Sequence, residues 1–194
     1  MRIEQVNAIF ADGVKNSELF QENTLVFGEG NTFQPVLMLI GEAPGAQEVR
    51  DQRPFVGKAG KNLDYFLKSI HQDRKDIYIT NAVKFRPTKI SNRGTSSNRS
   101  PSQLEQDVFK PWLLEEIEQV NPNLIVTLGN VALRVLMGRH YTIGSCHGEI
   151  MQGKETGRLV FPLYHPAAII YNHELKETYE RDLNKLKHFL SALE

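Results

Sequence analysis

The chain has 194 residues, of which 40% are hydrophobic and 24% charged, and its formal net charge is zero. These fractions are ordinary for a soluble protein, no apolar run approaches the roughly 18 residues of a membrane span, and the N-terminus lacks a signal-peptide pattern, so we expect a cytoplasmic protein. The single cysteine, Cys146, excludes an internal disulfide framework and any metal site held by several cysteines of this chain. Because the net charge is zero, binding to nucleic acid would require a local basic patch.

The first third of the sequence predicts a strand, a polar loop and a helix. Residues 3–10 indicate a short helix, and residues 25–27 a minor edge strand before a glycine turn. The apolar run at 36–40 lies between a proline and a glycine and is typical of a strand buried on both faces. A loop rich in glycine and proline follows and carries Glu42 and Glu48. Apolar spacing then predicts a helix, with core positions Leu63, Phe66, Leu67 and Ile70.

The alternation of strands and helices continues to the C-terminus. Strands are predicted at 77–83, 124–128, 147–152 and 158–164, and helices at 131–136 and 175–190. Another helix runs from Ser102, whose spacing from Glu105 fits a capping box, to residue 120, with a kink or break expected at 109–111 because of Pro111. Residues 165–168 are expected to form a loop after the last core strand.

These elements predict one domain over residues 1–194, an α/β fold. It should be a three-layer αβα sandwich with a central, mostly parallel sheet of about four strands. Such sheets place ligand sites at the carboxyl ends of their strands. The polar residues that follow the strands are therefore the candidates for chemistry.

Four sequence segments fall at these strand ends. They are GEAPGAQE, RPFVGKAGKNL, ITNAVKFRP and YHPAAIIYN. Together, in this order and over residues 25–172, they resemble the uracil-DNA glycosylase superfamily, and family 4 within it. The resemblance implies a monofunctional enzyme of base excision repair, which hydrolyses the N-glycosidic bond of uracil in DNA and leaves an abasic site.

Two residues suit recognition of an extruded base. Phe55 offers an aromatic face for stacking, although a core phenylalanine beneath a turn is the alternative. The amide of Asn81 can accept the imide N–H of uracil and donate to the adjacent carbonyl, whereas cytosine presents the opposite pattern. Its alternative is an asparagine that only caps the following turn.

The resemblance assigns catalytic roles to His165, Glu42 and Glu48. In the family this histidine donates to the uracil carbonyl on which negative charge develops, and its alternative is a structural histidine. Glu42 matches a residue that binds the base and positions or polarises water, and Glu48 a second acidic position; solvated loop carboxylates are the alternative for both. Ala43 stands where the best-known branch has an aspartate that activates water, so that general base is absent here.

Further contacts to base and DNA are expected around these residues. Close backbone approach is predicted at Gly41, Ala43 and Gly45, the last of which stands where the best-known branch has a tyrosine that excludes thymine. Residues 84–103 form a basic, flexible segment without acidic residues. The candidate phosphate contacts are Lys84, Arg86, Arg93 and Arg99, together with Ala167 in the loop after the catalytic histidine. A solvated cationic loop is the alternative reading of the basic segment.

Family 4 members hold a four-iron, four-sulfur cluster with four cysteines, and all four are missing here. The family's first cysteine pair falls at residues 14–19, and the third and fourth positions fall at Phe85 and near Phe109. We therefore predict no cluster and no metal or other cofactor, with packing of apolar side chains, including contact between the two rings, in its structural role.

The expected partner is uracil-containing DNA, single- or double-stranded, bound by a monomer and not by a membrane protein. Three alternatives stay open from the sequence. The chain could be a non-catalytic module that binds uracil or damaged DNA, or a glycosylase for another deaminated base. It could also be an α/β enzyme acting on a small nucleotide, which is weakened by the lack of a G-x-G-x-x-G or P-loop motif after the first strand.

Overall fold

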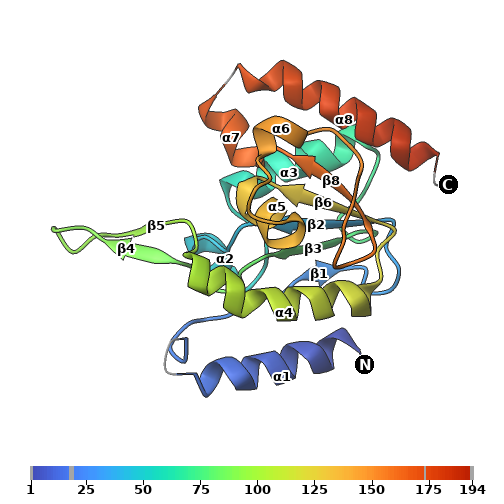
Figure 1. Ribbon diagram of the computed structural model, residues 1–194. Helices are drawn as coiled ribbons and strands as arrows, with labels where there is room; N and C mark the ends of the chain where they lie inside the picture. The colour runs from blue at the N-terminus through green and yellow to red at the C-terminus, as the bar shows by residue number, and fades with distance from the viewer. Residues whose placement is uncertain (1, 18–19, 173, 193–194) are drawn as a thin grey trace.

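The computed structural model describes residues 2–17, 20–172 and 174–192, which contain a six-stranded sheet in the order β1-β3-β2-β6-β8-β7 (Figure 1). The four central strands run parallel: β2 (Leu37–Gly41), β3 (Tyr78–Asn81), β6 (Leu124–Leu128) and β8 (Leu159–Leu163). The short edge strands β1 (Glu29–Gly30) and β7 (Met151–Gln152) pair antiparallel with β3 and β8. A separate hairpin contains β4 (Thr88–Ile90) and β5 (Ser96–Asn98).

Helices cover both faces of the sheet (Figure 1). One face is covered by α4 (Gln103–Val120) and α5 (Asn130–Met137), with α1 (Ile3–Lys15) packed against α4. The other face is covered by α3 (Lys58–Ser69) and α8 (Leu175–Ser191). Three short helices, α2 (Ala46–Asp51), α6 (Ile143–Cys146) and α7 (Pro166–Tyr171), lie in the connections. This arrangement confirms the predicted αβα sandwich with a parallel core of four strands.

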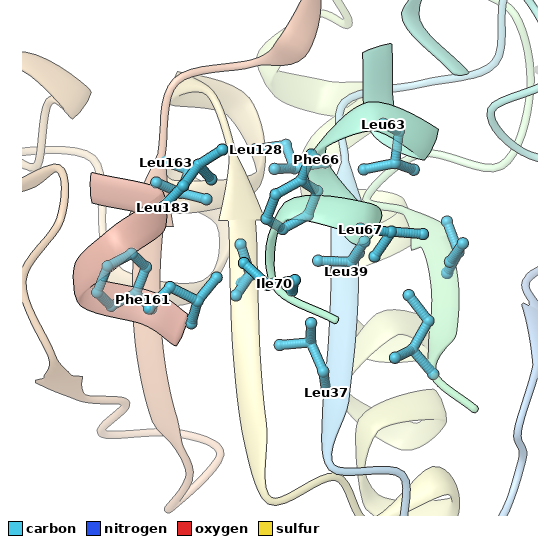
Figure 2. Close-up of a cluster of buried hydrophobic side chains, with 14 of the residues drawn as sticks. Leu37, Leu39, Leu63, Phe66, Leu67, Ile70, Leu128, Phe161, Leu163 and Leu183 are labelled. Carbon is cyan, nitrogen blue, oxygen red and sulfur yellow. The ribbon is translucent and has the colours of Figure 1, made fainter. Parts of the chain in front are cut away.

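All five residues of β2 are buried, because the strand lies in the middle of the sheet between β3 and β6. Leu37 and Leu39 pack among the side chains of α3 and α8, as Figure 2 shows for part of this cluster. Met38 and Ile40 belong to the opposite cluster, beneath α4 and α5. A strand alternates its side chains between two faces, so an unbroken apolar run is required when both faces are covered.

Several local predictions differ from the structure. The expected edge strand at 25–27 is wrong, because the strand that pairs with β3 is Glu29–Gly30. The expected loop at 165–168 is wrong, because α7 begins at Pro166, a residue whose fixed φ suits the first helical turn. Pro111 does not break α4, which continues to Val120 with its apolar side packed in the core. The predicted capping box at Ser102 and Glu105 is confirmed.

In the described part of the chain, none of the helices combines the length and the apolar character that a transmembrane span requires.

Candidate active site

The predicted site residues come together at one edge of the sheet because β2, β3 and β8 are parallel. Glu42 follows β2 directly, Asn81 is the last residue of β3, and His165 follows β8 after one intervening residue. A cavity of about 480 Å³ opens at this edge. Its lining includes Ala43, Gly45, Glu48, Phe55, Lys58, Asn81, Asn98, His165 and Ala167.

Gly41 lets two of these side chains meet at the end of β2. A Cβ atom on Gly41 would lie 2.4 Å from Cζ of Phe55 and 2.5 Å from Oδ1 of Asn81. The two side chains thus occupy the space that any larger residue would need. The sequence led us to expect a base or phosphate close to the backbone at Gly41, whereas the groups that approach it in the structure are side chains of the protein itself.

The backbone holds Phe55 at the cavity in a conformation that is rare for a large residue. Its φ is 53°, in the left-handed region. The guanidinium of Arg74 donates to the Phe55 carbonyl oxygen (2.5 Å), and a Cβ on Gly60 would lie only 1.9 Å from that oxygen. The ring is 5% exposed and lies nearly parallel to the His165 ring, with centroids 6.0 Å apart. Phe55 is therefore both a core residue and a cavity wall.

Glu48 forms hydrogen bonds with both ends of the segment that carries Phe55. One carboxylate oxygen accepts from the Gly45 amide (3.1 Å), and the other accepts from the amides of Val56 (3.1 Å) and Gly57 (2.8 Å). Because three backbone donors occupy this carboxylate, its geometry is that of a positioning residue. The Gly45 amide is likewise used inside the protein, so the expected contact of that amide with base or phosphate is not available.

The imidazole of His165 is fixed as a neutral donor. The Ala167 backbone N–H donates to Nδ1 of His165 (3.1 Å), so Nδ1 carries no proton and the ring proton resides on Nε2. Burial lowers the pKa of His165 from 6.5 to about 4. At neutral pH the ring is uncharged and can donate through Nε2 to a group in the cavity. Gly129, directly after β6, allows His165 to lie close to the backbone, because a Cβ atom on Gly129 would lie 3.2 Å from Cβ of His165.

Glu42 lies in a recess of about 350 Å³ that shares Ala43, Asn98, His165 and Ala167 with the main cavity. Burial raises the pKa of its carboxyl group, and a hydrogen bond with Ser100 opposes that rise. Its backbone carbonyl accepts from the Val83 amide (3.1 Å), which ties the residue to the segment after β3. Glu42 thus presents a half-buried carboxyl group in a recess next to the main cavity.

Asn81 is 3% exposed, and within the described chain no group hydrogen-bonds its side-chain amide. Its backbone carbonyl instead accepts from Nζ of Lys84 (2.7 Å). Lys84 is 2% exposed and forms a buried ion pair with Glu116 of α4 (2.5 Å). Burial lowers the pKa of Lys84, and the adjacent Glu116 opposes this. The prediction that Lys84 contacts phosphate is wrong, because an ammonium enclosed in the core cannot reach DNA.

The remaining predicted DNA contacts differ in their surroundings. Arg99 donates to both oxygens of Glu105 (2.7 and 2.6 Å), so its charge is paired within the protein. Arg86 is half-buried and donates to Oδ1 of Asn98 (2.7 Å). Arg93 is exposed in the turn between β4 and β5. Ala167 lies at both recesses, but its amide is used by His165.

The residues of this region that were not identified from the sequence include Lys58, Asn98 and Ser100. Lys58 begins α3 beside the main cavity. Asn98 and Ser100 sit in a polar segment without periodicity, where no pattern separates a cavity residue from a solvated one. Only the folding of this segment into a hairpin brings Asn98 to the cavity.

Aromatic side chains fill the region where the four cysteines of family 4 would fall. The rings of Phe85 and Phe109 lie 5.5 Å apart, which confirms their predicted contact. Phe20 packs on both, and Phe10 packs on Phe109, with centroids 5.1 to 5.5 Å apart. Val14 joins this cluster, whereas Glu18 and Leu19 of the expected cysteine-pair segment lie outside the described residues.

The residues present do not fit an iron–sulfur cluster, which requires four thiolates or close substitutes. Cys146 is the single cysteine and packs in a different cluster, with Leu133 and Ile143. Among the described residues, no group of three or more histidine, cysteine, aspartate or glutamate side chains is placed to hold a metal ion. Aromatic and apolar side chains pack around Phe85 and Phe109.

The fold and site define an αβα protein with a cavity at the carboxyl edge of its sheet, bounded by an aromatic ring, an amide and a neutral histidine. The family model described as the uracil DNA glycosylase superfamily matches residues 27–192. The chain belongs to this superfamily.

Curated relatives include type-4 uracil-DNA glycosylases from Saccharolobus solfataricus and Thermotoga maritima. The first is 38% identical, with 89% of this chain and 79% of the relative aligned. The second is 36% identical, with 86% and 83% aligned. The crystal structure of wild-type Pedobacter heparinus SMUG2 has a TM-score of 0.54 at 16% identity and covers 82% of this chain and 76% of that one, which supports the fold.

Proposed function

We propose that this chain is a monofunctional uracil-DNA glycosylase that hydrolyses the bond between uracil N1 and deoxyribose C1′ and leaves an abasic site. The observation that carries the proposal is the neutral tautomer of His165, a cavity-lining residue whose ring proton lies on Nε2, in a cavity that Phe55 and Asn81 also line. Membership in the superfamily supports the same activity. The enzyme would act as a cytoplasmic monomer on uracil-containing DNA.

Recognition would use the two side chains that meet at Gly41. The extruded uracil would stack on the Phe55 ring, an interaction of about 1–3 kcal/mol per base. Its N3–H would donate to Oδ1 of Asn81, and its O4 would accept from the amide nitrogen. Cytosine would place an acceptor against the acceptor and a donor against the donor, so it would be rejected.

Catalysis would depend on stabilising charge as the glycosidic bond breaks. The bonding electrons move to the uracil, and the neutral His165 would donate from Nε2 to the uracil carbonyl oxygen that becomes negative. The cation-like sugar at C1′ would then take the oxygen of a water, whose proton is released. Glu42 would orient this water and stabilise positive charge on the sugar.

The proposed enzyme needs no iron–sulfur cluster. Support comes from the aromatic cluster of Phe10, Phe20, Phe85 and Phe109, which packs the region where thiolates would be required. The cavity residues are held by other means, namely the Glu48 bonds and the buried Lys84–Glu116 pair.

The decisive experiment measures base release from matched single- and double-stranded oligonucleotides that carry one uracil, using protein whose iron content has been determined. Release by iron-free protein establishes a cluster-independent glycosylase. Tight binding of uracil-DNA without release would identify a non-catalytic module instead. Release of hypoxanthine or xanthine in place of uracil would identify a glycosylase for another deaminated base.

Replacing Glu42 by glutamine is expected to lower turnover and raise stability. Turnover should fall about a hundredfold, the lower range for general acid–base groups, and the acid limb of the wild-type rate profile should disappear. Because burial raises the pKa of Glu42, the folded protein binds more protons than the unfolded chain between pH 4.5 and the raised pKa. Wild-type stability therefore falls as pH rises through this interval. Thermal unfolding of the wild type and of Glu42→Gln at pH 5 and pH 7.5 tests this. Unfolding curves of the variant that match those of the wild type at both pH values would reject a buried, charged Glu42.

Replacing Arg93 by alanine is expected to weaken binding to all DNA sequences alike. The slope of log K against log salt should become shallower by about 1, because one phosphate contact is lost. Fluorescence anisotropy at several salt concentrations measures the slope. Arg181→Ala on α8 serves as the control for removal of an exposed arginine, and an Arg93→Ala slope equal to that of the control rejects the contact.

A further inference from the structure

The segment between α2 and α3 presents the Phe55 ring to the cavity, although its backbone is strained. Phe55 has a φ of 53°, and Gln52, which directly follows α2, has a φ of 49°. This left-handed conformation is costly for residues other than glycine and persists only where the surrounding structure holds it. The contacts of this segment therefore decide where the Phe55 ring lies.

Two charged side chains hold the segment, one through its amides and one through its carbonyl groups. Glu48 accepts from the amides of the two residues that follow Phe55. Arg74, in the turn before β3, donates from Nη2 to the carbonyl oxygen of Phe55 (2.5 Å) and from Nη1 to that of Pro54 (3.4 Å). In the described part of the chain, no other donor reaches either oxygen. The strained carbonyl of Phe55 thus depends on Arg74.

The first turn of α3 meets the same guanidinium. Nη2 of Arg74 also donates to the carbonyl oxygen of Gly60 (3.5 Å). A Cβ atom on Gly60 would lie 1.9 Å from the Phe55 carbonyl oxygen and 3.4 Å from Nη2 of Arg74. Only glycine leaves room for that oxygen at this point of the helix. One planar group therefore joins the strained segment to α3.

Two carboxylates fix the guanidinium itself. Asp64 of α3 accepts from Nε of Arg74 (2.7 Å), and an oxygen of Glu29 on β1 lies 3.5 Å from Nη1. The side chain of Arg74 is only 25% exposed, so these contacts are partly shielded from solvent. A guanidinium has five donors in a rigid plane and can serve carbonyl groups and carboxylates together, whereas a lysine has three donors on one nitrogen.

We propose that Arg74 is a positioning residue, which holds Phe55 in its left-handed conformation and so keeps the ring where an extruded uracil would stack. This inference rests on the proposed function, in which Phe55 is the stacking surface. Arg74 lies outside the cavity lining and would act on the base only through Phe55. Without the guanidinium, the Phe55 carbonyl loses its donor, and relaxation of the segment toward an ordinary φ would move the ring.

The test is a double-mutant cycle on uracil release from a single-stranded oligonucleotide, measured in single turnover with subsaturating full-length protein. Phe55→Ala should lower the second-order rate about 5- to 150-fold, which corresponds to the stacking of one base. Arg74→Met should lower it about fivefold or more when Phe55 is present, but less than about twofold when Phe55 is already alanine. A purely structural role would give the same loss in both backgrounds.

Arg53→Met is the matched control. Arg53 forms a two-pronged pair with Glu29 (2.8 and 3.1 Å), but in the described chain it donates to no carbonyl group of the segment. Its replacement should leave the rate within about twofold of the wild type. If Arg74→Met does not fold, the cycle uses Arg74→Lys, which keeps a cation beside Asp64. We expect a loss of about threefold or more with Phe55 present, and a wild-type rate for Arg74→Lys would reject the inference.

Other results also overturn the inference. If the wild type releases uracil, equal losses in the two backgrounds or full activity of Phe55→Ala reject the role of Arg74 and leave the glycosylase function intact. If the wild type releases no uracil, the proposed function fails, and positioning is judged by the NMR backbone chemical shifts of Phe55, which depend on φ. A change in the Arg74 variant but not in Arg53→Met supports the inference, whereas a change in both or in neither rejects it.

Discussion

Replacing His165 by alanine is expected to reduce the single-turnover rate of uracil release by about 10²- to 10³-fold, the loss typical of a removed oxyanion donor. Binding of uracil-containing DNA should change far less, because the carbonyl becomes strongly negative only as the glycosidic bond breaks. Rapid-quench measurement of the rate and anisotropy measurement of the affinity separate the two effects. A near wild-type rate for the alanine variant would refute the mechanism.

Two polar variants separate the roles of the ring nitrogens. Asparagine at position 165 can accept from the Ala167 amide as Nδ1 does, but it lacks a donor at the position of Nε2. Glutamine extends an amide N–H toward that second position. We expect His165→Asn to keep wild-type stability with the low rate of the alanine variant, and His165→Gln to regain part of the rate. A higher rate for His165→Asn than for His165→Gln would show that Nε2 is not the nitrogen that acts in catalysis.

The same residue makes a directional prediction for pH. Since burial lowers the pKa of His165 to about 4, the rate profile should show no step from this histidine near pH 6.5. Between pH 6.5 and 4 the unfolded chain binds the proton more readily than the folded protein, so the stability that the neutral ring contributes is full above pH 6.5 and is lost as pH falls toward 4. His165→Asn should lose this component of the pH dependence.

Replacing Lys84 by methionine is expected to destabilise the fold by about 3–5 kcal/mol, because Glu116 would remain buried without its cation. Such a loss is a large part of the stability of an ordinary domain. Urea unfolding, with the midpoint and slope fitted together, measures it. The double variant Lys84→Met, Glu116→Gln removes the uncompensated charge and should recover much of the stability.

A loss below about 1 kcal/mol for Lys84→Met would contradict an ion pair that is buried as the structure has it, since a pair exposed to solvent is worth about that much. The substitution also bears on activity. Lys84 donates to the backbone carbonyl of Asn81, and Glu116 accepts from Thr80 and from Tyr78, so this network holds the end of β3. The residue thought to reach the DNA instead supports the residue that would read the base.

The aromatic cluster of Phe10, Phe20, Phe85 and Phe109 holds the region beside the site together by packing. Four rings from separate parts of the chain meet there, with Val14 and Val83 in the same cluster. Ring pairs at edge-to-face geometry contribute about 0.5–1.5 kcal/mol beyond their buried area. Such packing requires no assembly of a metal group and is insensitive to oxidation of thiolates.

Much of the site was determined by the sequence itself. Apolar runs and glycine or proline boundaries fixed the parallel strands, and residues directly after such strands must gather at one edge, so Glu42, Asn81 and His165 could be placed together. The loss of the cysteines and the contact between Phe85 and Phe109 also followed from residue types at known positions. Local periodicity and strand direction are sufficient for these inferences.

Only the tertiary structure decided which charged side chains are free to contact DNA or substrate. A lysine in a basic segment looks the same in sequence whether it is solvated or paired, and only the approach of α4 buries Lys84 against Glu116. The same holds for Glu48, whose carboxylate accepts from backbone amides three, eight and nine residues away, and for Asn98, which reaches the cavity through the register of a hairpin. Burial and hydrogen-bond partners depend on segments distant in the chain, and a single sequence carries no periodic signal for them.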